Sequence, residues 1–262
     1  MFGSPTSTPP GRPLILGHRG ASHDAPENTL TAFRLALEQG ADGVELDVWR
    51  CGSGEVVVIH DPDTARTGGG APALRVQSAS LRDLRALDVG AWKHARYRGE
   101  RVPLLAEVLD VLPQAFVNVE LKSSGAPDLG LARATALVVA GARAAERCLV
   151  SSFDPILLAG FRLAAPRVPV GVLFADDGAW RLREALGTRL LRVRAVHPQR
   201  TLVDEGRARA WRARGLALNV WTVDDAAEVA RLAGLGASAI ITNRPALARA
   251  VLPRAGDASG AV

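Results

Sequence analysis

The sequence of 262 residues has few cysteines and no long apolar run, and each shortage excludes a class of protein. Its only cysteines, Cys51 and Cys148, lie about a hundred residues apart without CxxC spacing, which argues against a disulfide framework or a zinc site. No apolar run approaches the roughly 18 residues of a transmembrane helix, so we expect no stable insertion into a membrane. The start of the chain also lacks the apolar core of a signal peptide. We therefore expect a cytoplasmic protein.

Lysine is almost absent as well. Of the 32 basic residues only Lys93 and Lys122 are lysine, and the net charge is +5. A basic balance would allow binding to nucleic acid. The arginines are scattered, however, and no basic run contains interleaved aromatic residues, so we expect no nucleic-acid partner. Composition does not predict an oligomeric state.

Apolar residues make up 48% of the chain, enough for one large core. Apolar runs of strand length alternate with segments of helical periodicity, and this alternation lapses over residues 62–101. The strands are predicted at 14–16, 43–48, 56–59, 116–121, 148–151, 168–174, 193–196, 216–221 and 239–242. The helices are predicted at 30–40, 80–87, 104–112, 132–145, 156–164, 180–186, 204–214, 225–233 and 245–251.

Counting the strand pair that ends at His60 as one unit gives eight strand–helix units. This number predicts an α/β fold, a (β/α)8 TIM barrel over residues 13–252. Residues 62–101 are then an insertion after strand 2, which is either a functional lid, a small inserted subdomain or a tolerated surface insertion. A doubly wound open sheet is the alternative, because closure of a sheet cannot be read from sequence. Residues 1–12 are predicted to be a flexible leader and residues 253–262 a flexible tail.

The segment GVELDV places two carboxylates inside an apolar strand. Side chains alternate across a strand, so Glu45 and Asp47 point the same way. Two buried negative charges need a cation within reach, from a metal or from basic side chains. A third carboxylate, Glu120, lies at the end of FVNVEL, and Lys122 comes two residues later. Three hard oxygen ligands without a thiolate favour Mg²⁺ or Ca²⁺ over zinc.

Other polar and aromatic residues also fall at predicted strand ends. His18 and Arg19 lie between two glycines after the first strand, His60 follows the VVVI run, and Trp221 ends a later strand. The active sites of TIM barrels lie at the C-terminal ends of the strands, so we expect these residues to meet the three carboxylates on one rim. Arg19 and Lys122 suit phosphoryl oxygens, the two histidines suit a general base and a general acid, and Trp221 is expected to line the pocket. Together they describe phosphodiester cleavage.

Simpler structural explanations exist for some of these residues. The acids and their basic neighbours could form a salt-bridge network in the barrel mouth. The remaining histidines have no comparable neighbours in sequence and are predicted to be surface or structural residues. Two tryptophans, Trp92 and Trp180, are predicted to be packing residues.

Seven segments in order, LGHRGASHDAPENTLTAF, GADGVELDV, VVVIHD, VNVELK, SSFDP, NVWTVDD and ITNRP, resemble the glycerophosphodiester phosphodiesterase family. They run from about Leu14 to Pro245, nearly the whole predicted domain. The resemblance implies a barrel like that of phosphatidylinositol-specific phospholipase C, with an insertion after strand 2. It places the family's catalytic histidines on His18 and His60. Its metal-binding acids and phosphate-contacting basic residues fall on Glu45, Asp47, Glu120, Arg19 and Lys122.

Members of this family hydrolyse a glycerophosphodiester to an alcohol and sn-glycerol 3-phosphate, so the resemblance implies a small-molecule substrate of this class. In the implied route, one histidine deprotonates the attacking hydroxyl and the other protonates the leaving alkoxide, with the glycerol 2-hydroxyl as a candidate first nucleophile. Two alternatives stay open. One is lysophospholipase-D-like hydrolysis of lysophospholipids, which an exposed apolar lip on residues 62–101 would favour. The other is a non-catalytic barrel that binds a phosphate ligand.

Overall fold

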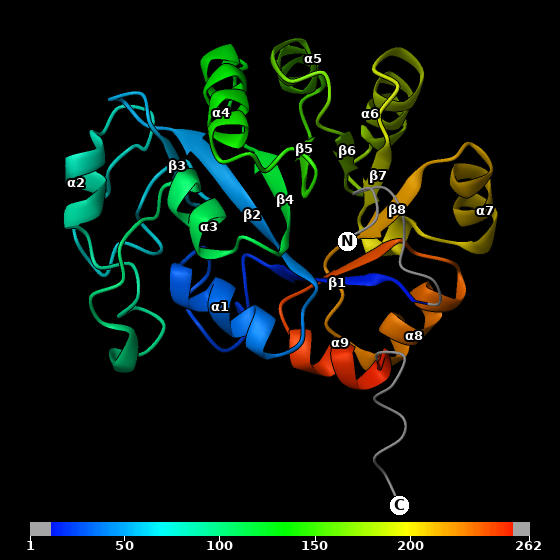
Figure 1. The fold of residues 1–262 in the computed structure, drawn as a ribbon, viewed down its shortest axis with the longest axis horizontal. Helices are drawn as coiled ribbons and strands as arrows, with labels where there is room; N and C mark the ends of the chain where they lie inside the picture. The colour runs from blue at the N-terminus through cyan, green and yellow to red at the C-terminus, as the bar shows by residue number, and fades with distance from the viewer. Residues whose placement is uncertain (1–11, 254–262) are drawn as a thin grey trace, which may run out of the picture.

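The computed structural model describes residues 12–253, and its centre is a closed barrel of parallel strands surrounded by helices (Figure 1). Closure comes from the first barrel strand, β1 (Leu14–His18), which pairs in parallel with β2 (Gly43–Arg50) on one side and with β9 (Ala239–Thr242) on the other. The predicted TIM barrel is confirmed, and the open-sheet alternative is wrong. The predicted leader and tail lie outside the described residues, apart from Arg12 and Pro253.

The other elements follow in chain order. The remaining strands are β3 (Val56–Val58), β4 (Phe116–Leu121), β5 (Cys148–Ser152), β6 (Val170–Phe174), β7 (Ala195–Pro198) and β8 (Ala217–Val220). The α-helices are α1 (Leu30–Glu38), α2 (Leu81–Ala86), α3 (Leu105–Val111), α4 (Leu129–Gly141), α5 (Pro155–Ala164), α6 (Trp180–Ala185), α7 (Glu205–Ala213), α8 (Ala226–Gly234) and α9 (Pro245–Val251). Short helical turns are η1 (Ala95–Tyr97), η2 (Leu186–Leu190) and η3 (Arg200–Leu202).

Alternation along the strands separates the two faces of the barrel wall. In β2, Val44, Leu46 and Val48 belong to the main apolar core shared with the helices, whereas the carboxylates between them belong to the barrel interior. A second apolar cluster fills much of the barrel interior. It consists of Leu16, Phe116, Leu149, Ala195, Ala217, Ala239 and Ile241. Polar residues buried on the barrel strands include Asn118, Ser151, His197 and Asn219. The interior is therefore filled with side chains, and the functional groups lie at one end of it.

The insertion at residues 62–101 forms a small lobe beside the barrel, at the side where β3 lies (Figure 1). Strand β3 pairs antiparallel with the end of β2, which extends past the barrel wall. Val76, Leu84 and Val89 of the insertion pack against this extension in a separate apolar cluster, whose other members are Trp49, Cys51, Val57, Ile59 and Val102. The insertion is therefore attached to the barrel through the end of β2 and through β3.

Several predicted boundaries differ from the structure. The helix predicted at 132–145 begins at Leu129 and ends at Gly141, because Asp128 accepts a hydrogen bond from the Gly130 N–H and caps the first turn. The strand predicted at 193–196 is shifted to Ala195–Pro198, since the N–H of Val193 is bonded to the preceding helical turn at Gly187. Within the described residues, no helix has the length and apolar character needed to cross a membrane.

Candidate active site

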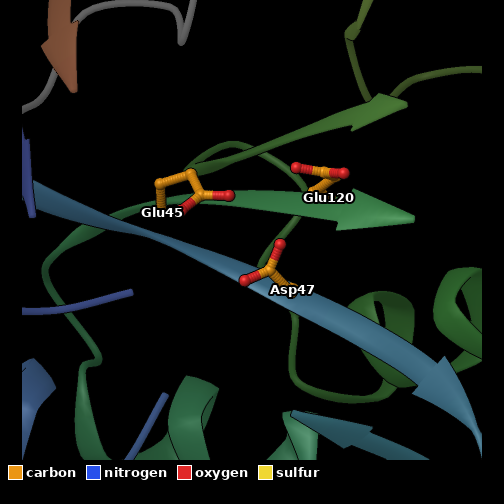
Figure 2. A group of neighbouring side chains, drawn as sticks. All are labelled: Glu45, Asp47 and Glu120. Carbon is orange, nitrogen blue, oxygen red and sulfur yellow. The ribbon is translucent and has the colours of Figure 1, made fainter. Parts of the chain in front are cut away.

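Three carboxylates meet inside the mouth of the barrel (Figure 2). Glu45 and Asp47 come from β2 and Glu120 comes from the neighbouring β4, where Asp47 and Glu120 are register partners. All three residues are buried, and each offers an oxygen within 4.8 Å of oxygens of the other two. The shared orientation predicted from GVELDV is confirmed.

Basic and amide side chains surround this cluster. Lys122 Nζ donates to Glu120 Oε1 at 2.8 Å and lies 3.3 Å from Asp47 Oδ1. On the other side of Asp47, the Nε of Arg19 lies 3.3 Å from Oδ2, and Asn28 Nδ2 donates to the same oxygen at 2.9 Å. Asp47 is therefore the best compensated of the three acids.

The pKa values of the acids reflect this uneven compensation. Burial raises the pKa of Asp47, but the charges of Lys122 and Arg19 outweigh burial and hold that pKa well below its ordinary value. Burial and the two neighbouring carboxylates raise the pKa of Glu45 well above its ordinary value. Burial also raises the pKa of Glu120, against the opposing effect of Lys122. Three carboxylates thus share two basic side chains, of which Arg19 also pairs with Glu27, so at least one negative charge is left uncompensated.

This uncompensated charge fits a divalent cation. Carboxylate oxygens are the ligands that hard cations prefer in proteins, and the site contains three of them from two adjacent strands. The raised pKa values of Glu45 and Glu120 indicate that the ionised forms need more positive charge than the described side chains supply. The cluster could therefore bind a metal ion, with Glu45, Asp47 and Glu120 as ligands.

The turn after β1 directs His18 and Arg19 toward these acids. Arg19 has a φ of 56°, in the left-handed region that residues other than glycine rarely adopt, and Gly20 follows with a φ of 84°. A Cβ at position 20 would lie 2.6 Å from the carbonyl carbon of Ala32, so α1 leaves room for glycine alone. The backbone N–H of Arg19 donates to the carbonyl oxygen of Glu45 at 2.9 Å. The chain thus holds an unfavourable conformation that presents a guanidinium to Asp47.

His18 has a neutral hydrogen-bond partner. Its Nδ1 lies 2.7 Å from Oδ1 of Asn243, and its Nε2 lies 3.9 Å from Oε2 of Glu45. Burial of the ring and the nearby charge of Arg19 lower the pKa of His18 to about 4. His18 is therefore a neutral imidazole at physiological pH, which is the form that can accept a proton.

His60, in contrast, has a charged partner. Its Nδ1 lies 2.6 Å from Oδ1 of Asp61. Asp61 Oδ2 accepts from Arg66 Nε at 2.7 Å, and both terminal nitrogens of Arg66 donate to the carboxylate of Glu27, at 2.7 and 2.8 Å. Glu27 also accepts from Arg19 at 3.0 Å. This chain of ion pairs connects the segment of His60 to the turn that carries Arg19.

Two cavities meet at His18 and Arg19. The inner one, of about 220 Å³, has a polar wall and an apolar wall, and the apolar wall consists of Phe153, Leu173, Trp221 and Ile241. The rings of Phe153 and Trp221 meet edge to face, with centroids 5.7 Å apart. The outer cavity, of about 680 Å³, is lined in part by Trp92 and Lys93 of the insertion. The site therefore offers a small half-apolar chamber that opens beside a larger polar one.

Comparison with known proteins identifies the family. Residues 18–247 match the sequence profile of the glycerophosphoryl diester phosphodiesterase family. The chain belongs to this family. A glycerophosphodiester phosphodiesterase of Caldanaerobacter subterraneus subsp. tengcongensis is 32% identical over 234 residues, which cover 88% of this chain and 94% of that protein.

Solved structures of glycerophosphoryl diester phosphodiesterases and related enzymes have the same fold. The glycerophosphodiester phosphodiesterase of Agrobacterium tumefaciens is 29% identical, with a TM-score of 0.78 over 91% of this chain and 99% of that one. A phosphodiesterase of Oleispira antarctica, solved in complex with the product sn-glycerol-3-phosphate, is 28% identical, with a TM-score of 0.79 over 92% of this chain and 96% of that one. The predicted family resemblance is confirmed.

Nearly all the residues predicted for a glycerophosphoryl diester phosphodiesterase site line the inner cavity. They are His18, Arg19, Glu45, His60, Glu120, Lys122 and Trp221. Asp47, the remaining predicted residue, is 1% exposed and lies beneath the others. Trp92, predicted to be a packing residue, lines the outer cavity and is 36% exposed.

Sequence reasoning assigned no role to the residues that hold these groups in place. Glu27, Asn28, Asp61 and Asn243 each make a hydrogen bond to a predicted site residue. The first two lie in PENT and the last in ITNRP, segments that carry the resemblance, so the signal for them was present. The contacts of Asn28 with Asp47 and of Asn243 with His18 could not be read from it, because they depend on how the strands pair in the barrel.

Proposed function

We propose that this chain hydrolyses glycerophosphodiesters to an alcohol and sn-glycerol 3-phosphate by two-histidine general acid–base catalysis. The observation that carries the proposal is the inner cavity, in which two imidazoles meet two basic side chains and two acids of the carboxylate cluster. Membership of the family supports the same reaction. The Oleispira antarctica relative was solved with sn-glycerol-3-phosphate, which is the product that this reaction releases.

The hydrogen-bond partners of the histidines support an assignment of their roles. Asp61 is an anion, so it stabilises an imidazolium, and His60 is assigned as the acid that protonates the leaving alkoxide. Asn243 is neutral, and His18 is assigned as the base that removes the proton of the attacking hydroxyl. Arg19 and Lys122 stabilise the negative charge that develops on the phosphoryl oxygens. Trp221 contributes to the apolar wall against which the carbon skeleton of the glycerol packs.

Proton transfer balances over two steps. In the first, the glycerol 2-hydroxyl oxygen attacks phosphorus as His18 takes its proton, the P–O bond to the alcohol breaks, and His60 supplies the proton that completes the alcohol. In the second, water attacks the cyclic phosphate, gives its proton to His60, and the bond to the 2-oxygen breaks as His18 returns its proton. Both histidines end in their starting states, and sn-glycerol 3-phosphate is released.

The acids of the cluster are assigned as ligands of Mg²⁺ or Ca²⁺. Such an ion, when bound, supplies Lewis-acid polarisation of the phosphoryl group. Glu45, Asp47 and Glu120 would hold it, while Lys122 keeps two of these carboxylates in position. Binding of Mg²⁺ or Ca²⁺ in particular stays a prediction. A cytoplasmic location also stays a prediction.

The surface of the insertion favours a small substrate over a lysophospholipid. A lysophospholipid-hydrolysing enzyme needs an apolar lip beside the site to accept an acyl chain. Among the described residues of 62–101, Trp92 is the one large apolar side chain that is exposed, and cations flank its ring, with Lys93 Nζ and Arg66 Cζ each 6.0 Å from the centroid. The insertion thus presents a charged rim to the outer cavity.

Product release tests the proposal directly. Purified protein is incubated with glycerophosphocholine and with glycerophosphoethanolamine, with and without EDTA, and sn-glycerol 3-phosphate is measured. We expect release that EDTA abolishes, that Mg²⁺ or Ca²⁺ restores, and that His18→Ala and His60→Ala each reduce by at least about 100-fold. His94→Ala, an exposed histidine outside both cavities, is the matched control and is expected to retain activity. No release by the metal-loaded wild type from any small glycerophosphodiester would overturn the proposal, and lysophospholipids would be tested next.

A further inference from the structure

Two residues on other loops of the barrel, Asn243 and Asp224, form a hydrogen-bonded chain that ends at Nδ1 of His18. Asn243 follows β9, and its Oδ1 lies 2.7 Å from the Nδ1 of His18. Asp224 follows β8, and its carboxylate accepts from Asn243 twice, from Nδ2 at 2.6 Å and from the backbone N–H at 2.7 Å. The hydroxyl of Thr242 also donates to Asp224, at 3.0 Å. These hydrogen bonds connect the ends of β1, β8 and β9 at the Nδ1 side of the His18 ring.

The carboxylate of Asp224 fixes the orientation of the Asn243 amide. A carboxylate only accepts hydrogen bonds, so the amide end that lies 2.6 Å from it must be the NH₂ group. The reversed amide would place two acceptors at that distance, with no proton between them. The hydroxyl of Ser22 donates to the other end of the amide, Oδ1, at 2.7 Å, which agrees with this orientation. Asn243 therefore presents an acceptor to His18.

A fixed acceptor selects one tautomer of the imidazole. Because Asn243 Oδ1 can only accept, Nδ1 of the neutral His18 ring must carry the proton. Nε2 is then left with a free lone pair, and it is the nitrogen that lies on the side of Glu45, 3.9 Å from Oε2. The other tautomer would place a proton on Nε2 and two acceptors against each other at Nδ1.

We propose that Asp224 and Asn243 are positioning residues that hold His18 in the tautomer with a proton on Nδ1, so that Nε2 faces the substrate as the base. This inference rests on the proposed function for its catalytic consequence, but the tautomer itself does not depend on it. Asp224 acts through Asn243 and touches neither the substrate nor the reacting atoms. Its role is to make one of two nearly equivalent ring nitrogens available.

The tautomer can be observed in the ring ¹⁵N spectrum. The chain has five histidines, so protein labelled with ¹⁵N-histidine gives few ring signals, and His18→Gln identifies those of His18. At pH 7.5 we expect wild-type His18 to show a protonated Nδ1 and an unprotonated Nε2. In Asp224→Asn the new amide can donate or accept, and in Asn243→Ala the acceptor is gone, so both variants are expected to populate the other tautomer.

Kinetics on the metal-loaded enzyme give the second readout. For both variants we expect kcat to fall by about 10- to 100-fold, the usual effect of removing a group that orients an active-site histidine, while KM changes less than about threefold. Asp225→Asn is the matched control, because Asp225 is adjacent and its carboxylate accepts from the Glu228 N–H as the α8 cap. Asparagine caps a helix about as well as aspartate, so this variant is expected to keep both the α8 cap and the tautomer of His18.

The outcomes separate positioning from a merely structural role. Wild-type His18 with its proton on Nε2, or variants that keep the Nδ1-protonated form and a kcat within twofold of wild type, would overturn the inference. A lower melting temperature alone, with unchanged ring signals, would mean that Asp224 and Asn243 only tie the loops together. If the wild type has no activity, the proposed function fails, while the ¹⁵N spectrum still decides the tautomer.

Discussion

A buried histidine makes the stability of this barrel depend on pH in a calculable way. His197 lies on β7 inside the barrel and is fully buried, and its Nε2 lies 3.1 Å from Asn219 Nδ2. In the described part of the chain, its Nδ1 has no hydrogen-bond partner. Burial lowers the pKa of His197 from 6.5 to about 3, so the folded chain keeps this ring neutral at pH values where the unfolded chain protonates it.

The sign and size of the effect follow from proton linkage. Below about pH 6.5 the unfolded chain binds a proton at position 197 that the folded chain does not bind, until the pH approaches 3. The free energy of unfolding therefore falls as the pH falls through this window, and the histidine contributes no pH dependence above it. One such group gives a slope that approaches about 1.4 kcal/mol per pH unit, and about 2.3 kcal/mol in total between pH 6.5 and 4.5, because the unfolded ring is only half protonated at pH 6.5.

Urea unfolding followed by far-UV circular dichroism measures this slope. The comparison is between wild type and His197→Gln, whose amide oxygen can accept from Asn219, over pH 7.5 to 4.5. His18 also has a lowered pKa, but it is present in both proteins, so its contribution cancels in the difference. The variant is expected to lose stability less steeply, by about 1.4 kcal/mol per pH unit. Equal slopes in the two proteins would refute the reasoning, and His197→Leu offers a second variant without a titrating group.

Other changes test the close packing and the charge arrangement. A Cβ at position 43 would lie 2.1 Å from the carbonyl oxygen of Phe116, so Gly43→Ala is expected to lower the free energy of unfolding by about 3 kcal/mol. Gly141→Ala, in α4 with open space around the new Cβ, is expected to raise the free energy of unfolding by about 0.5–1 kcal/mol. Urea midpoints that shift in the same direction for Gly43→Ala and Gly141→Ala would contradict these two predictions. Burial raises the pKa of the Cys148 thiol to about 12. At pH 8 we therefore expect iodoacetamide to label Cys148 at least about 100-fold more slowly in the folded than in the unfolded protein, measured by mass spectrometry. Equal labelling rates would contradict this prediction. Lys122→Met is expected to lower kcat by about 100-fold or more, and a loss under about tenfold would count against its role at the phosphoryl group.

The barrel could be predicted because its strands are short apolar runs separated by helical patterns. Strands buried on both faces need apolar residues at nearly every position, and this requirement is visible without any structure. Boundaries were less accurate where a local contact decides them. Asp128 caps α4, which begins three residues before the predicted start. A loop usually contains several polar residues that could act as the cap, and the sequence alone does not show which one does.

The carboxylate cluster could also be predicted, because alternation alone places Glu45 and Asp47 on one face. The partners of the histidines could not. Asp61 is adjacent to His60, but Asn243 is separated from His18 by 225 residues and meets it only where β9 closes against β1. Spacing along a chain carries no information about such a contact until the register of the closing strands is known.

The apolar cluster shared by the insertion and the end of β2 has a consequence for any exchange of the insertion. Trp92 and Lys93 stand on a lobe whose core shares no buried side chain with the core between the barrel wall and its helices. The lobe is nevertheless tied to the site, because Trp49 of β2 belongs to its core and Arg66 pairs with both Glu27 and Asp61. A different lobe would therefore change the lining of the outer cavity, and it would have to keep these contacts with β2 and with the segments of Arg19 and His60.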